Sequence, residues 1–145
     1  MLQHQRECGK INKLRQKGWM SMKIHESAEN YLETILVLHQ RKGSVRSIDI
    51  ANELEFSKPS VSVAMKNLRQ KGYIEVDAAG QIHLLPEGQA IAEAVFEKHR
   101  LMTEFLVALG VAPEIAAEDA CRIEHVLSDE SFEAIKGHAE KFTKN

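Results

Sequence analysis

The sequence is poor in cysteine and in aromatic residues, and it has no long apolar run. Its two cysteines, Cys8 and Cys121, lie far apart, which does not suggest a disulfide framework and favours a reduced compartment such as the cytoplasm. Aromatic residues make up 6% of the chain, which fits a helical core of Leu, Ile, Val and Ala. No apolar stretch approaches the roughly 20 residues that cross a bilayer, and residues 1–23 lack the apolar core of a secretory signal. We therefore expect no segment that spans a membrane.

The motifs of several common enzyme classes are also missing. The chain has no glycine-rich phosphate loop, no HExxH pattern and no Cys–His pair with a matching orienting group. Cys121, Glu124 and His125 have the chemistry to hold a catalytic zinc, but nothing in the sequence marks a substrate pocket. We therefore predict that the protein is not an enzyme.

The net charge is only −2, yet the charges are unevenly distributed. Residues 87–140 carry 12 acidic and 4 basic residues, whereas residues 57–72 carry 4 basic residues and no acidic one. Solvated helix faces would explain this pattern, and so would a first half that binds an anion such as DNA. Residues 1–22 are basic without a clear amphipathic period, so we expect a disordered or artefactual extension there.

The part of the chain at 23–86 has the pattern of a winged helix. Amphipathic helices are predicted over residues 26–43, 44–56 and 57–72, the third with Ser57 as N-cap and Pro59 in its first turn. The stretch "YIEVDAAGQIHLL" that follows predicts a β-hairpin with a turn over residues 77–80. Two helices joined by a short turn and followed by a small hairpin form a winged helix-turn-helix.

Residues 87–145 predict a second, all-helical domain, so the fold class is mainly α. A long helix is expected from Pro86 to about Leu109, followed by helices over residues 112–127 and 129–142. We expect an inward-facing apolar stripe on the long helix, formed by Ile91, Val95, Met102, Leu106 and Leu109.

The basic third helix is the candidate for DNA recognition. Its Val61, Met65 and Leu68 predict the buried side. The N-terminal residues of such a helix approach base edges in the major groove, while lysines contribute salt-dependent affinity for phosphates. The predicted DNA-binding residues are Ser57, Lys58, Pro59, Ser60, Ser62 and Lys66.

A candidate metal site lies in the stretch "AAEDACRIEHVLS". Cys121, Glu124 and His125 share one helix face at spacings of three and four, and their mixed donors suit a divalent first-row metal. A buried cysteine beside an exposed acid and a surface histidine explains the stretch equally well. His99, which lies beside the inward stripe, and Glu33, which shares a face with Asn30, add donors from two other helices and favour the metal site.

Several motifs together resemble the DtxR/MntR family of metal-dependent transcriptional repressors. These motifs are "SAENYLETI", "SKPSVSVAMKNLRQKGYI", "LLPEGQAIA", "KHRLMTEFL" and "ACRIEHVLSDE", and the resemblance covers residues 26–142. It implies a homodimer that binds palindromic double-stranded operators, with Fe(II) or Mn(II) as corepressor of metal-uptake genes. The chain resembles the short, two-domain members of the family, which lack the SH3-like domain of longer members.

The resemblance also implies a ligand set. His99, Glu124 and His125 match family ligands, and Glu33 matches an acid of the first helix that binds metal in manganese-type members. Cys121 stands where iron-type members have Cys and manganese-type members have Glu, while Asn30 replaces Asp or Met. Thr103 and Ala117 replace ligands of the ancillary site that iron-type members have.

The metal is then expected to join the first helix to the second domain and to set the spacing of the two recognition helices in the dimer. That spacing is about one DNA turn, roughly 34–36 Å. The alternative is a winged-helix regulator that is independent of metal and responds to a small molecule or a protein partner.

Overall fold

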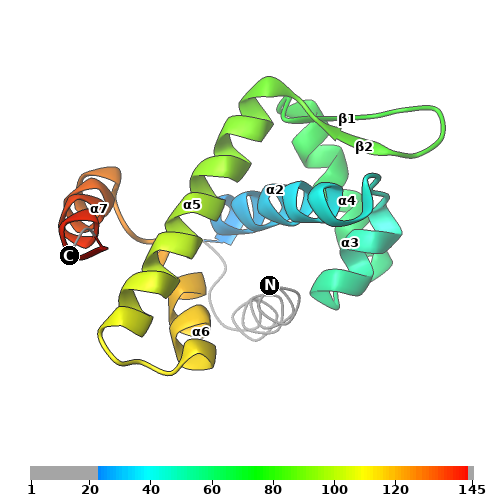
Figure 1. Ribbon diagram of the computed structural model, residues 1–145. Coiled ribbons are helices and arrows are strands. Elements are labelled where there is room, and N and C mark those ends of the chain that lie inside the picture. The colour runs from blue at the N-terminus through cyan, green and yellow to red at the C-terminus, as the bar shows by residue number, and fades with distance from the viewer. Residues whose placement is uncertain (1–22, 144–145) are drawn as a thin grey trace. The chain divides into compact units, whose positions relative to one another are not determined.

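The computed structural model describes residues 23–143, so the extension predicted for residues 1–22 lies outside the described residues. The chain forms two compact units, of which the first ends at Val95 and the second begins at Phe96. The elements of Figure 1 are, in order, α2 (Lys23–Lys42), α3 (Ser47–Leu54), α4 (Lys58–Gln70), β1 (Ile74–Val76), β2 (Ile82–Leu84), α5 (Pro86–Ala108), α6 (Pro113–Ile123) and α7 (Asp129–Thr143). This is the expected mainly helical architecture with one small hairpin. A domain boundary after residue 86 stays a prediction. None of the described helices is long and apolar enough to cross a membrane.

The core of the first unit is formed by α2, α3, α4 and the hairpin. The predicted inward side of α4 is buried, with Val61, Met65 and Leu68 all at most 4% exposed. They share the core with apolar side chains of the other elements, among them Leu32, Ile35, Leu38, Ile50, Leu54, Ile74 and Ile82. The burial of these side chains holds the helix-turn-helix in place and leaves the opposite side of α4 exposed.

Helix α4 begins as the sequence predicts. Ser57 is the N-cap, its hydroxyl accepts a hydrogen bond from the backbone N–H of Ser60, and Pro59 lies in the first turn, where a missing N–H is tolerated. The preceding helix ends at Leu54, and its C-cap Glu55 adopts the left-handed conformation with φ of 56°. The two helices of the motif are therefore separated by a turn of three residues.

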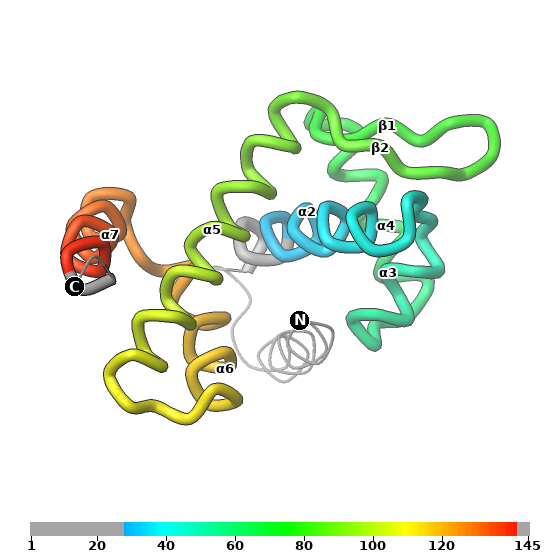
Figure 2. Tube along the Cα trace, viewed as in Figure 1, coloured from blue at the N-terminus to red at the C-terminus, as the bar shows by residue number. Residues whose placement is uncertain are grey.

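The hairpin forms the wing. Strands β1 and β2 are antiparallel, with Glu75 opposite His83, and both are visible beside α4 in the ribbon and in the tube of Figure 2. Asp77 closes the turn, because its carboxylate accepts hydrogen bonds from the backbone N–H groups of Ala79 and Gln81, at 2.9 Å each. The wing is anchored by the Ile82 N–H, which donates to the carbonyl of Val45 at 2.7 Å.

Gly88, in the first turn of α5, packs directly against the backbone that precedes β1. A Cβ at this position would lie well inside van der Waals contact with the carbonyl group of Tyr73. Gly88→Ala is therefore expected to lower the free energy of unfolding by about 1–3 kcal/mol, the range for overpacking. Chemical denaturation measures this change.

Gly137→Ala is the matched control for that prediction. Gly137 also lies in a helix, but a Cβ there meets nothing within 4 Å. The substitution should be neutral or should stabilise by up to about 1 kcal/mol, because alanine is the better helix former. Equal effects of the two substitutions would contradict the close approach at Gly88.

The second unit is formed by the C-terminal half of α5 with α6 and α7. Lys98 pairs with Asp129 at 2.8 Å, and Lys136 pairs with Glu97 at 2.8 Å, so two ion pairs join α5 to α7. The hydrogen bond and charge of Lys98 lower the pKa of the Asp129 carboxyl, and those of Glu97 raise the pKa of Lys136. These pairs are exposed, so their contribution to stability is small.

Two details of this unit differ from the prediction. Helix α6 ends at Ile123 and not near residue 127, because the chain turns over residues 124–126 before Ser128 caps α7 by accepting from the N–H of Ser131. Leu109, expected in the inward stripe of the long helix, is 67% exposed. It lies beyond the last residue of α5, in the turn that leads to Gly110.

Candidate metal centre and nucleic-acid interface

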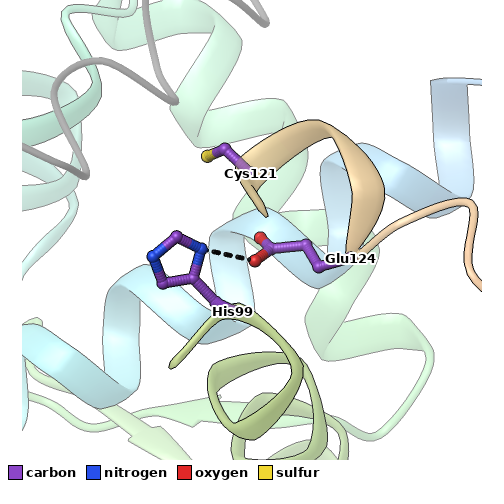
Figure 3. A group of neighbouring side chains, drawn as sticks. All are labelled: His99, Cys121 and Glu124. Carbon is purple, nitrogen blue, oxygen red and sulfur yellow. Dashed lines mark ion pairs between the residues drawn. The ribbon is translucent and has the colours of Figure 1, made fainter. Parts of the chain in front are cut away.

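Three of the predicted metal ligands come together in the second unit. His99, Cys121 and Glu124 each offer a donor atom, and these atoms lie within 4.8 Å of one another. All three residues are buried, at 7%, 6% and 2% exposed respectively. Figure 3 shows the carboxylate of Glu124 facing the imidazole of His99, with the side chain of Cys121 beside them. The geometry thus brings His99 to two donors that lie more than twenty residues further along the sequence.

Local structure explains how α5 and α6 present these donors. His99 lies on α5 between the buried residues Val95 and Met102, as its spacing predicts. Cys121 lies on the buried face of α6, and Glu124 directly follows the helix as its C-cap with αR backbone angles. Because Glu124 continues the helical turn, its side chain stays on the same face as Cys121, although the helix itself has ended.

The carboxylate of Glu124 lies between two imidazoles. Its Oε2 is 2.7 Å from Nδ1 of His99, and its Oε1 is 3.3 Å from Nε2 of His125. The side chain of His125 is only 2% exposed, so it is not the surface histidine of the alternative interpretation. A buried carboxylate is costly unless charge or hydrogen bonds compensate it, and both histidines face it here.

The donor set fits a divalent first-row transition metal. Imidazole, carboxylate and thiolate together suit Fe(II), Co(II), Zn(II) and, less well, Mn(II), which prefers oxygen and nitrogen donors. The structure has the sulfur of Cys121 in a disulfide, whereas the two distant cysteines of the sequence predict no disulfide framework. A metal can bind this sulfur only after reduction to the thiolate.

The two other predicted ligands belong to the first unit. Asn30 and Glu33 lie on α2 and are each only 4% exposed, so both polar side chains are buried. The backbone carbonyl of Asn30 accepts a hydrogen bond from the hydroxyl of Thr34 at 2.8 Å. The role of Asn30 and Glu33 as ligands stays a prediction.

The predicted DNA-binding face is open to solvent. All six predicted residues on or beside α4 are exposed: Ser57, Lys58, Pro59, Ser60, Ser62 and Lys66. The first unit thus presents hydroxyls, a proline ring and ammonium groups on the side of α4 opposite its buried stripe. The role of each residue in DNA binding stays a prediction.

Sequence reasoning missed one residue of this face. Val63 is apolar and yet 61% exposed in the middle of α4. Its position in the sequence could have predicted this exposure, because Val63 follows the buried Val61 by two residues and therefore points to the other side of the helix. It shares the exposed side with Pro59, four residues earlier, and with Lys66, three residues later.

The wing carries a histidine–aspartate pair of its own. His83 on β2 faces Asp77, with Nε2 and Oδ2 3.0 Å apart, and hydrogen bonding to His83 is the main cause that lowers the pKa of the Asp77 carboxyl. His39 at the end of α2 binds the carbonyl of Ile82 through Nε2 at 2.8 Å. The wing is therefore held to α2 by the side chain of His39, and to the connection between α2 and α3 by the backbone bond to Val45.

A groove runs between α5 and α7 in the second unit. It is lined by apolar residues, Leu101, Phe105, Ala108 and Leu109, and by charged residues such as Arg100 and Glu104. Val107, Ile115 and Val126 are also exposed apolar residues of this unit. Apolar surface of this extent in so small a unit is typical of a surface that pairs with another chain.

Together, these features define a class of protein. The chain combines a winged helix, whose basic helix is exposed, with a buried group of metal donors. These are the two parts of a metal-responsive DNA-binding regulator. Residues 23–81 match the iron-dependent repressor N-terminal DNA-binding domain, and residues 85–145 match the iron-dependent repressor metal-binding and dimerisation domain. The chain belongs to the iron-dependent repressor family of metal-dependent transcriptional regulators.

Individual relatives agree with this membership. The transcriptional regulator MntR of Escherichia coli O6:H1 is 35% identical over 116 residues, which are 80% of this chain and 75% of that protein. The diphtheria toxin repressor of Corynebacterium diphtheriae is 34% identical over 106 residues, 72% of this chain and 47% of the repressor. The solved structure of the manganese regulator SloR has a TM-score of 0.70 and 29% identity over 78% of this chain and 53% of that one. This chain thus spans about half the length of the latter two.

Proposed function

We propose that this chain is a repressor of metal-uptake genes that binds palindromic operators as a homodimer, with Fe(II) or Mn(II) as corepressor. The observation that carries the proposal is the buried group of His99, Cys121 and Glu124, which lies in the part of the chain that matches a metal-binding and dimerisation domain. The description of the family names iron, whereas the related SloR is a manganese regulator. The sulfur of Cys121 favours iron.

The proposed metal site consists of His99, Cys121, Glu124 and His125, with Glu33 and Asn30 as further predicted ligands. Bound there, the metal supplies only coordination bonds. It acts as corepressor because it binds the DNA-competent arrangement of the dimer more tightly than other arrangements. No catalytic step is required of any residue, so we expect a regulator without enzymatic activity that acts in the cytoplasm, where its operator DNA lies.

The direct test of this function is operator binding with and without metal. Fluorescence anisotropy on DNA from the protein's own promoter, recorded anaerobically with a reductant, should show tight binding with Fe(II) or Mn(II) and much weaker binding with chelator. Equal affinity under both conditions would instead favour a metal-independent winged-helix regulator.

We further propose that Val63 contacts the methyl group of a thymine. Apolar contact with this methyl is one of the ways in which the major groove is read, and Val63 is the exposed apolar side chain of α4. Replacing the thymines of the bound promoter DNA by deoxyuracil, which lacks the methyl, should weaken binding of the wild type. One buried methyl group is worth about 0.8 kcal/mol, or about fourfold in affinity.

Val63→Ala should bind the thymine and the deoxyuracil DNA with nearly equal affinity. Val126→Ala is the matched control, because Val126 is equally exposed, at 62%, but lies outside the winged helix. This control should retain the full preference for thymine. A preference for thymine that persists in Val63→Ala would show that another group reads the methyl.

A further inference from the structure

Thr103 lies one helical turn after His99 on α5 and contacts it twice. Its hydroxyl donates a hydrogen bond to the backbone carbonyl of His99 at 2.8 Å, and its Oγ1 lies 3.3 Å from Nε2 of the imidazole ring. The other ring nitrogen, Nδ1, faces Glu124 at 2.7 Å. The two nitrogens of His99 therefore have different neighbours, and the neighbour of Nε2 is a hydroxyl.

The proton count of the hydroxyl assigns a role to each nitrogen. A threonine hydroxyl has one proton, and here that proton is used in the bond to the carbonyl of His99. Toward the ring, Oγ1 can only accept, so Nε2 must carry the N–H that donates to it. A histidine ligand commonly has its second nitrogen held by an oxygen in this way, which sets the tautomer and the orientation of the ring.

From these contacts we infer that Thr103 is a positioning residue of the metal site. It holds the Nε2–H of His99 and thereby leaves Nδ1, the nitrogen that faces Glu124, as the atom that binds the metal. This inference rests on the proposed function, because it requires His99 to be a ligand. It also gives Thr103 a role of its own. The family resemblance implies only that Thr103 replaces a ligand of the ancillary site.

Two variants separate the hydroxyl from the shape of the side chain. Thr103→Val removes the hydroxyl and keeps the branched shape, whereas Thr103→Ser keeps the hydroxyl. Partners of this kind change metal affinity by about 10–100-fold when they are lost. The dissociation constant for Mn(II), measured by competition with a chelating dye in a reducing buffer, should rise at least about tenfold in Thr103→Val and should stay close to the wild-type value in Thr103→Ser.

The binding nitrogen itself can be observed by NMR. Full-length protein with ¹⁵N-labelled histidine is loaded with ¹¹³Cd(II), which is NMR-active and accepts thiolate and imidazole ligands. Wild type and Thr103→Ser should show a ¹¹³Cd–¹⁵N coupling to Nδ1 of His99 and a protonated Nε2. Thr103→Val should lose this single form, either through a second set of His99 signals or through exchange broadening.

The outcomes separate this inference from the proposed function. A wild-type coupling through Nε2 of His99, or a Thr103→Val protein with unchanged coupling and affinity, would overturn the role of Thr103 while His99 remains a ligand. If no coupling to His99 is found in the wild type, His99 is not a ligand, and both the site assignment and the inference are wrong.

Discussion

Replacing Glu124 by Gln is expected to leave the protein folded and to abolish the response of operator binding to metal. The carboxylate is buried and faces the imidazoles of His99 and His125. Gln has nearly the same size, but its amide is a poor ligand for a divalent first-row metal and carries no charge. The loss of metal affinity should reach at least about 100-fold, the upper end of what removal of an outer partner costs.

The measurement is a metal titration followed by operator-binding anisotropy, with circular dichroism to check the fold. Glu114→Gln is the control, since Glu114 is an exposed acid in the first turn of α6, the helix that Glu124 follows. The control should respond to Fe(II) or Mn(II) as the wild type does. A Glu124→Gln protein with a wild-type metal response would remove Glu124 from the site.

Cys121→Glu is expected to move the metal preference from iron toward manganese. A thiolate favours Fe(II) over Mn(II), whereas an additional carboxylate suits Mn(II) better. We expect the ratio of the Fe(II) to the Mn(II) affinity to fall by roughly tenfold. Anaerobic competition titrations with both metals, in the presence of a reductant, measure this ratio.

The chain offers a matched control for the cysteine. Cys8→Ser removes the only other cysteine and should retain the preference of the wild type. If the ratio does not change in Cys121→Glu, the sulfur is not what determines the choice of metal, and the preference for iron that we infer from Cys121 has no basis.

The sequence predicts most of the winged helix because local signals agree there. Three signals indicate the same helix: the cap at Ser57, the proline in the first turn, and the apolar spacing of Val61, Met65 and Leu68. The structure confirms this helix. The predicted end of α6 is wrong, because only the apolar pattern indicated it. The apolar pattern continues past Ile123, but the helix ends there because the chain turns toward the cap of α7.

The candidate metal site could be predicted in composition but not in detail. Spacing alone places Cys121, Glu124 and His125 on one side, and the same spacing fits an ordinary helix. What distinguishes a metal site from an ordinary helix is the burial of all three side chains together with His99. That burial depends on how α5 packs against α6. Likewise, the spacing of His99 and Thr103 is visible in sequence, but which ring nitrogen faces the hydroxyl depends on the rotamer of the histidine.

The most direct test of the proposed site is X-ray absorption spectroscopy of the reduced full-length protein loaded anaerobically with one equivalent of Fe(II). The account predicts one sulfur neighbour together with nitrogen and oxygen neighbours that include histidine. It also predicts that the sulfur contribution disappears in Cys121→Glu while the histidine contribution remains. A wild-type spectrum with only nitrogen and oxygen neighbours, or one without histidine, would contradict the assignment of the metal to His99, Cys121 and Glu124.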